Sequence, residues 1–194
     1  MTTSTRRTVE ERRDQLLELG LRLFGSKPYD EISIDEIARL AGTSKGLLYH
    51  YFPSKRDFYV ACLRAASVQL RRLMRPDPGL PPMEQVRCGL SVYLDHVKAN
   101  PAKNEALLRG GIGSDPEVLE VMEETRRAVW ESLLAGMRAS ADEHLLRFAV
   151  RGWVRFVEVM ALDWARSDAV EKAALIDVCL GVLTAAVERS RAAR

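Results

Sequence analysis

Cysteine and histidine are scarce in this chain of 194 residues, which contains three of each. Cys62, Cys88 and Cys179 are odd in number, lie far apart and form no CxxC pair. This pattern argues against a disulfide framework and favours a reducing compartment. The histidines show no metal-ligand spacing with one another or with the cysteines, so we expect no metal site.

Long apolar runs are also absent. No stretch approaches the roughly 18 apolar residues that a membrane span requires, and the first residues, MTTSTRRT, are not an apolar signal segment. Hydrophobic residues make up 47% of the chain and charged residues 29%, which is ordinary for a globular protein. We therefore expect a cytoplasmic protein.

Signatures of catalysis are missing as well. The chain has no nucleophile elbow, no Ser-His-Asp order and no nucleotide-binding fingerprint. Its glycine-rich segment, RGGIG at 109–113, lacks the GxxxxGK[ST] pattern and a preceding strand, which argues against a phosphate-binding loop. An enzyme is disfavoured and no cofactor is expected. Turnover that depends on His96 or Glu158 would be the observation in favour of catalysis.

The net charge is only +2, too small to indicate nucleic-acid binding by itself. Residues 1–56 contain ten Lys and Arg against eight Asp and Glu, which leaves 19 of each sign in the remainder. The small positive excess therefore lies in the N-terminal part, and such a distribution is consistent with a DNA-binding region there.

Two short helical segments joined at a glycine stand out between residues 33 and 58. Ser33 can cap a helix over Ile34–Leu40, and Gly42 suits a tight turn because glycine adopts positive φ without steric cost. Thr43 and Ser44 offer hydroxyl caps for a second helix that ends before a proline. This arrangement is typical of a helix-turn-helix, whose second helix enters the DNA major groove.

The second short helix has an unusual outward surface. Leu48 and Phe52 can face inward as anchors, which leaves outward Lys45, Gly46, Leu47, Tyr49, His50 and Tyr51. Aromatic and hydrogen-bonding side chains suit base edges and phosphates better than they suit a solvated face. Lys55 lies in the first turn of the following helix, where it and the free N–H groups can hold a phosphate. The alternative is a packed helical corner with unrelated exposed aromatics.

This stretch closely resembles the N-terminal DNA-binding domain of the tetracycline-repressor (TetR) family of bacterial transcription regulators. The resemblance covers about residues 9–60 and is carried by Phe24-Gly25, Tyr29-Asp30, Ile37-Ala38, Ala41-Gly42, Ser44-Lys45-Gly46, Leu48-Tyr49-His50-Tyr51-Phe52 and Ser54-Lys55. It implies DNA contacts in two groups. Base edges or the adjacent backbone would be approached by Lys45, Gly46, Leu47, Tyr49 and His50; phosphates would be contacted by Ser33, Thr43, Tyr51 and Lys55, with Ser44 in the same DNA-binding set.

The expected fold is all-α, with about nine helices in two domains. Residues 1–54 would form a three-helix helix-turn-helix domain, and residues 55–194 a helical effector-binding and dimerisation domain. A long helix predicted over Ser54–Arg75 starts at the proposed phosphate site and runs away from it by about 30 Å. Such a helix could link a distant pocket to the DNA-reading part.

The last two predicted helices, at about 142–165 and 169–193, carry apolar residues over more than one stripe. This is wider than packing within one chain needs, and it predicts a partner surface. In the family these two helices form a four-helix dimer interface, so the resemblance implies a homodimer. A two-fold dimer would bind a double-stranded, pseudo-palindromic DNA operator.

The family usually binds a small-molecule effector among its middle helices, and the resemblance implies the same here. Candidate pocket residues are the apolar Tyr93, Met122, Trp130, Trp153, Phe156 and Met160 and the polar His96, Arg109, Arg126 and Glu158. Each aromatic residue also suits an ordinary core, and Glu158 could instead pair with Arg155 or Arg151 or be exposed. The expected function is a repressor that an unidentified effector releases from DNA. A constitutive regulator without a ligand and an activator remain open.

Overall fold

The structure is a computed structural model that describes residues 9–75, 77–99, 101, 104 and 114–193. Within these residues it contains eight α-helices, one 3₁₀ turn and no strand, which confirms the predicted all-α class. The elements are α1 (Val9–Ser26), η1 (Tyr29–Glu31), α2 (Ile34–Leu40), α3 (Lys45–Tyr51), α4 (Lys55–Leu73), α5 (Pro82–Ala99), α7 (Pro116–Gly136), α8 (His144–Ala165) and α9 (Lys172–Ala192).

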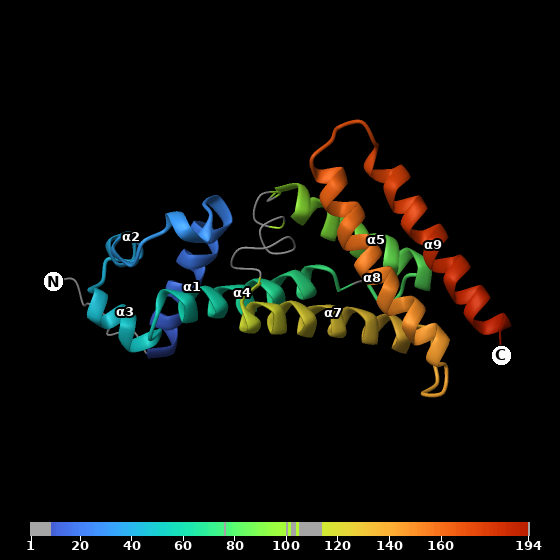
Figure 1. Cartoon of the computed structure of the whole chain (residues 1–194), viewed down its shortest axis with the longest axis horizontal. Coiled ribbons are helices and arrows are strands. Elements are labelled where there is room, and N and C mark those ends of the chain that lie inside the picture. Colours follow the sequence, from blue (N-terminus) through green and yellow to red (C-terminus); the bar gives the residue numbers. More distant parts are fainter. Residues whose placement is uncertain (1–8, 76, 100, 102–103, 105–113, 194) are drawn as a thin grey trace.

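The molecule is elongated, and two long helices connect its ends (Figure 1). Helices α1, α2 and α3 gather at one end, and α5, α8 and α9 at the other. Between them α4 and α7 run side by side and pack against each other. Because α4 also packs on α1 and α7 also packs on α8, this pair belongs to both ends.

The core of the N-terminal end is built around aromatic rings. Phe24 of α1 meets Tyr59 of α4 edge to face at 4.9 Å, and Phe52 meets Phe58 at the same distance. Such arrangements add to the free energy gained by burying the rings. The first half of α4 thus helps to hold the short helices in place, and Val118 and Val121 of α7 complete this core.

The core of the C-terminal end lies between α5, α8, α9 and the last part of α7. Apolar residues of α8 recur at helical spacing toward this core, so that Val150, Val157 and Ala161 are buried. The indole Nε1 of Trp153 donates a hydrogen bond of 2.8 Å to the carbonyl oxygen of Cys179, which joins α8 to α9.

Two helix ends differ from the sequence prediction. The sequence predicts a last helix that Asp168 caps and that starts at Ala169, but α9 begins at Lys172, and the Asp168 carboxylate binds Lys98 at 2.6 Å. The apolar period after Pro116 predicts a helix to about Ser140, but α7 ends at Gly136, and Arg138, with φ 51°, turns the chain toward α8. Pro101 also predicts the start of a short helix, but most of that segment lies outside the described residues. None of the described helices has the length and apolar character needed to cross a membrane.

A glycine allows α1 and α4 to approach each other closely. Gly20 is buried, and a Cβ atom placed there would lie 2.6 Å from Cζ of Phe58 and would also overlap the sulfur of Cys62. Both neighbours are themselves buried in the N-terminal core and have little room to move.

We expect Gly20→Ala to destabilise the fold by about 1–3 kcal/mol, because it overpacks the α1–α4 contact. The measurement is the urea midpoint at fixed protein concentration. Gly136→Ala is the matched control, since a Cβ atom at Gly136 would meet nothing within 4 Å. Equal stability of the two variants would show that α1 and α4 do not depend on this close approach.

Candidate nucleic-acid interface

Three serines cap the short helices and the long helix that follows. The hydroxyl oxygen of Ser33 accepts from the N–H of Glu36 at 3.1 Å, and that of Ser44 accepts from the N–H of Leu47 at 3.1 Å. Ser54 accepts from the N–H of Asp57 at 3.0 Å at the start of α4. Each cap satisfies a backbone donor that the helix leaves unpaired, which stabilises helices of only seven residues.

The turn between α2 and α3 is held from both sides. Gly42 has φ of 59°, as the sequence predicted, and the N–H of Thr43 donates to the carbonyl oxygen of Ala38 at 3.0 Å. Arg12 reaches across from α1 and donates to the carbonyl oxygens of Ala41 and Gly42 at 3.2 and 3.4 Å. The angle between α2 and α3 is therefore set by α1 as well as by the turn.

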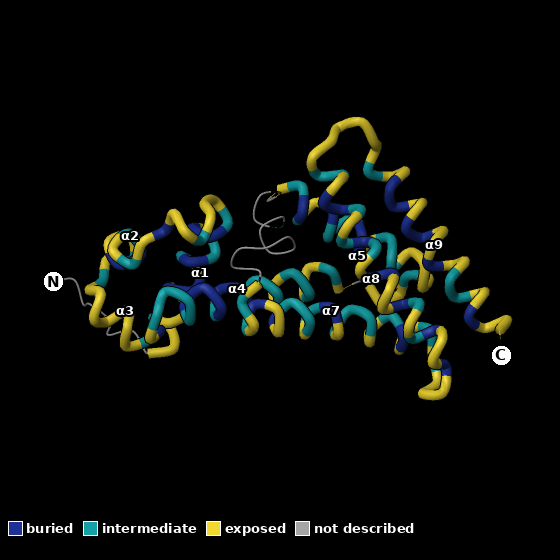
Figure 2. The backbone as a smooth tube through the Cα atoms, viewed as in Figure 1, coloured by how far each residue is buried: buried dark blue, intermediate teal, exposed yellow. Residues whose placement is uncertain are grey.

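Helix α3 has a buried back and an exposed front. Leu48 is completely buried and Phe52 nearly so, as predicted for the anchors. The predicted contact residues on the front are exposed: Lys45, Gly46, Leu47, Tyr49 and His50. Figure 2 colours most of α3 as exposed, at the N-terminal end of the molecule.

Some predicted phosphate contacts are less accessible. Tyr51 is half-buried and packs against the N-terminal core, and the Thr43 hydroxyl oxygen is buried and has no hydrogen-bond partner among the described residues. Ser33 is exposed, and its hydroxyl can still donate a hydrogen bond while it caps α2.

Neighbouring side chains contact the two lysines of the predicted DNA-binding set, Lys55 and Lys45. Lys55 Nζ lies 4.1 Å from the ring centre of Tyr29, a cation–π contact at the start of α4. Lys45 forms an ion pair with Asp35 on α2, and both side chains are largely exposed. Because exposed pairs contribute only about 0–1 kcal/mol, a phosphate can replace the carboxylate at small cost.

An arginine joins the start of α4 to the start of α7. The Arg56 guanidinium binds both carboxylate oxygens of Asp115 at 2.6 and 2.7 Å, and it binds Glu117 at 2.8 Å. Asp115 also caps α7 by accepting from the N–H groups of Glu117 and Val118. The Arg56 hydrogen bonds, together with the two backbone bonds, lower the pKa of Asp115. This contact, one residue after Lys55, was not predicted from the sequence.

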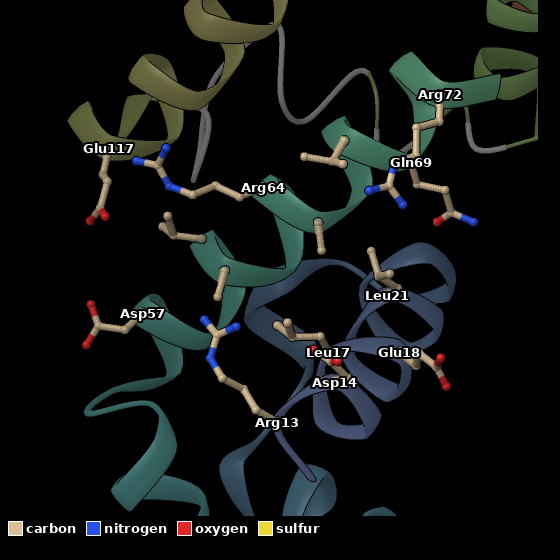
Figure 3. Close-up of a pocket in the computed structure, with 14 residues that line it drawn as sticks. Arg13, Asp14, Leu17, Glu18, Leu21, Asp57, Arg64, Gln69, Arg72 and Glu117 are labelled. Carbon is tan, nitrogen blue, oxygen red and sulfur yellow. The ribbon is translucent and has the colours of Figure 1, made fainter. Parts of the chain in front are cut away.

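A groove of about 810 Å³ runs between α1 and α4 (Figure 3). Leu17 and Leu21 line its α1 side, and Arg64, Gln69 and Arg72 lie along α4, with Glu117 of α7 at one end. Its charged rim carries both signs. None of the residues predicted for the effector pocket lines this groove.

Three of the predicted pocket residues come together between α5, α7 and α8. Arg126 donates from Nε to both carboxylate oxygens of Glu158 at 2.7 and 2.9 Å, and the Arg126 side chain is 8% exposed. Burial and the neighbouring Glu158 carboxylate raise the pKa of Tyr93. The sequence had offered Arg155 or Arg151 as partners of Glu158; the main partner is Arg126, and Arg155 lies at 4.0 Å.

The other predicted pocket residues are spread more widely, although Trp130 lines a small hollow together with Arg126. Trp153 is buried against α9, Met122 packs on the N-terminal core, and Phe156 and Met160 pack on the C-terminal core. Trp130 is half-buried on α7, and His96 is half-buried on α5. Arg109 lies outside the described residues. Within the described part of the chain, no group of three or more His, Cys, Asp and Glu side chains is placed to hold a metal ion.

An apolar face is exposed on α8 and α9. Phe148 is 67% exposed and Val159 59%, and the other large members of this face are Leu145, Val178 and Val182. None of them belongs to the C-terminal core.

Two family profiles match the chain. One, described as bacterial regulatory proteins of the tetR family, matches residues 16–62. The other, described as a tetracyclin repressor-like C-terminal domain, matches residues 82–186.

Individual proteins agree with these profiles. The transcriptional repressor KstR of Rhodococcus jostii (strain RHA1) is 28% identical over 106 residues, 55% of this chain and 50% of KstR. The transcriptional activator FasR of Mycolicibacterium smegmatis (strain ATCC 700084 / mc(2)155) is 24% identical over 165 residues, 82% of this chain and 74% of FasR. The crystal structure of a tetR-family transcriptional regulator from Streptomyces coelicolor superposes with a TM-score of 0.86 at 31% identity, over 97% of this chain and 85% of that chain.

We expect the Arg56 contact to make stability sensitive to acid. Because the pKa of Asp115 lies below its ordinary value of 3.8, the stabilisation is fully present above that pH and is lost as the pH falls through the lowered pKa. Arg56→Met should therefore lower the urea midpoint at pH 6, and its difference from wild type should shrink toward pH 3.

Arg64→Met is the matched control, because Arg64 also joins α4 to α7 but through an exposed pair with Glu124 at 2.8 Å. It should change the midpoint little at either pH. If the two variants behaved alike, Arg56 would be one surface ion pair among several.

Proposed function

The chain belongs to the tetR family of bacterial regulatory proteins, and we propose that it acts as a homodimeric repressor that a small-molecule effector releases from a pseudo-palindromic operator. The family is one of transcription regulators with a DNA-binding helix-turn-helix, not of enzymes. A regulator of this kind works where the bacterial chromosome lies, in the cytoplasm.

The observation that carries DNA binding is the exposed front of α3. Leu48 is fully buried on the opposite side, so the front cannot turn inward without breaking the core. Lys45 and His50 offer polar groups there, and Tyr49 is 45% exposed and offers both a hydroxyl and an apolar ring. These groups suit base edges and thymine methyls, and Lys55 at the start of α4 suits a phosphate.

Dimerisation is supported by the exposed apolar face of α8 and α9. A monomer that exposed Phe148 and Val159 beside Val178 would leave a continuous apolar patch in water. A two-fold axis through this face would bury it against its own copy and would place two α3 helices at one end of the assembly. Half-sites about 34 Å apart, one turn of DNA, would then match the pair.

Release by an effector is supported by the way α7 reaches the DNA-binding end. We divide the chain after Ser54 into a DNA-binding domain and an effector domain, with α4 packing in both. A ligand that shifts α7 would pull on Asp115 and Glu117, and through Arg56 on the start of α4 beside Lys55. Such a shift would change the spacing of the two α3 helices and lower operator affinity.

The sign of regulation depends on where the operator lies relative to the promoter, and relatives of both signs exist in KstR and FasR. We propose repression because a dimer that covers a promoter excludes polymerase without any further contact surface. Activation would need a second surface that recruits polymerase.

The experiment that tests DNA binding is genome-wide footprinting with the purified protein, followed by titration of the bound duplex. Tyr49→Ala should weaken binding to that site by about 1–3 kcal/mol and leave non-specific binding unchanged. Lys55→Ala should weaken binding to all duplexes and make the dependence on salt less steep, by about one unit of log–log slope per lost contact.

Lys98→Ala is the charge-matched control, because Lys98 lies on α5 and pairs with Asp168. It should bind as wild type does. Wild-type binding without sequence preference, unchanged by Tyr49→Ala, would remove α3 from the role of recognition helix.

We expect Phe148→Glu to dissociate the dimer, since it places a charge on the most exposed residue of the apolar face. Sedimentation equilibrium should show a monomer for this variant and a dimer for wild type. Leu119→Glu is the control, because Leu119 is a comparably exposed apolar residue, 49% exposed, on α7. A monomeric wild type, or dissociation by the control alone, would contradict the proposed interface.

A further inference from the structure

A second hollow, of about 210 Å³, lies between α7 and α8. The residues that line it are Glu123, Arg126 and Trp130 of α7 and Arg151, Gly152 and Arg155 of α8. Drug-sized pockets are larger, from about 300 Å³, so a space of this size admits a small molecule only.

Positive charge is in excess around this hollow. Glu123 accepts from Arg155 at 2.8 Å, and Glu158 accepts from Arg126 at 2.7 Å. Arg151 has no carboxylate partner among the residues that the structure describes. The walls therefore present three guanidinium groups, of which one has no counter-charge and the buried one, Arg126, is held rigidly.

The ring of Trp130 contacts Arg151, the guanidinium without a carboxylate partner among the described residues. The guanidinium carbon of Arg151 lies 5.5 Å from the centre of the Trp130 ring, and that of Arg147 lies 5.9 Å from it. Stacking on an aromatic ring orients a guanidinium and leaves its in-plane N–H donors available. The indole Nε1 of Trp130 is itself buried and has no hydrogen-bond partner in the described part of the chain.

Gly152 leaves the opposite wall open. A Cβ atom at this position would meet no atom within 4 Å, so the absence of a side chain leaves free space and is not a packing requirement. Gly152 is exposed and lies between Phe148 and Val159 along α8, so this wall of the hollow borders the proposed dimer face. The hollow thus combines guanidinium N–H donors, the ring of Trp130 and room for a short apolar group.

We propose that this hollow binds the carboxylate of a small organic acid. Guanidinium forks match the two oxygens of a carboxylate, and charge-assisted hydrogen bonds of this kind are stronger than neutral ones. The Trp130 ring and the open space at Gly152 accept a short apolar body, which distinguishes an organic acid from free phosphate.

The ligand would join α7 to α8, and α7 carries Asp115 and Glu117 at its other end. A shift of α7 would therefore reach Arg56 and the start of α4. This consequence for DNA rests on the proposed function, whereas binding of the acid to the hollow does not.

The test uses the full-length protein and benzoate as the probe, with calorimetry and tryptophan fluorescence as readouts. Benzamide, which has the same shape without the charge, and inorganic phosphate, which has charge without the apolar body, are run beside it. We expect benzoate to bind and the other two to bind much more weakly. Arg151→Met should reduce benzoate affinity about tenfold or more, since it removes a charged hydrogen-bond donor.

Arg127→Met is the matched control, because Arg127 is an exposed neighbour of Arg126 that does not line the hollow. It should bind benzoate as wild type does. The proposal is wrong if benzoate fails to bind, if Arg151→Met binds it unchanged, or if phosphate binds better than benzoate. It is also wrong if Arg151→Met weakens the dimer and no acid binds, because a carboxylate of the partner subunit would then fill the hollow.

Operator binding with and without benzoate separates this inference from the proposed function. Benzoate should lower operator affinity in wild type and should lower it less in Arg151→Met. That result supports both the acid-binding hollow and the proposed regulator. Loss of operator recognition in Tyr49→Ala with benzoate binding intact would show that the two sites are independent parts of one protein. If wild type binds benzoate but never the operator, the hollow stands and the regulator proposal fails.

Discussion

The contact of Arg56 with Asp115 and Glu117 is the point on which the two ends of the molecule depend. It ties the first turn of α4 to the first turn of α7, and Asp115 also supplies the cap that starts α7. The Asp115 side chain therefore both caps the start of α7 and joins α7 to α4. A bidentate guanidinium–carboxylate pair fixes the relative orientation of its two partners, so the starts of α4 and α7 are held together at this point.

Around this joint the two cores share α7. The N-terminal core takes Phe58 and Tyr59 from α4 and Val118 from α7, and the C-terminal core takes Leu134 from the far end of α7. Helix α7 thus enters both cores, whereas α4 contributes residues to the N-terminal core alone. A boundary at Ser54 would therefore divide residues that pack in one N-terminal core, and does not coincide with a gap in packing. A close-packed interior transmits a shift of one helix to its neighbours.

Much of the N-terminal end was predictable because its signals are local. The caps at Ser33 and Ser44, the positive φ of Gly42 and the buried anchor Leu48 all follow from residues within a few positions of one another. The exposed front of α3 then follows from helical periodicity. The start of the last helix was not predictable in the same way. Aspartate is a residue type that often caps a helix, but Asp168 pairs with Lys98, which lies 70 residues away in the sequence.

Sequence by itself determined the fold class, the helix-turn-helix and the side of α3 that faces outward, since each depends on short-range propensity, capping and periodicity. Tertiary structure alone decided that Glu158 pairs with Arg126, that Gly20 lets α1 meet α4, and that Arg151 remains without a carboxylate among the described residues. The physical reason is that pairing between distant charges depends on helix rotation and separation in space. Helical periodicity shows which residues share a face, but not which face of another helix they meet.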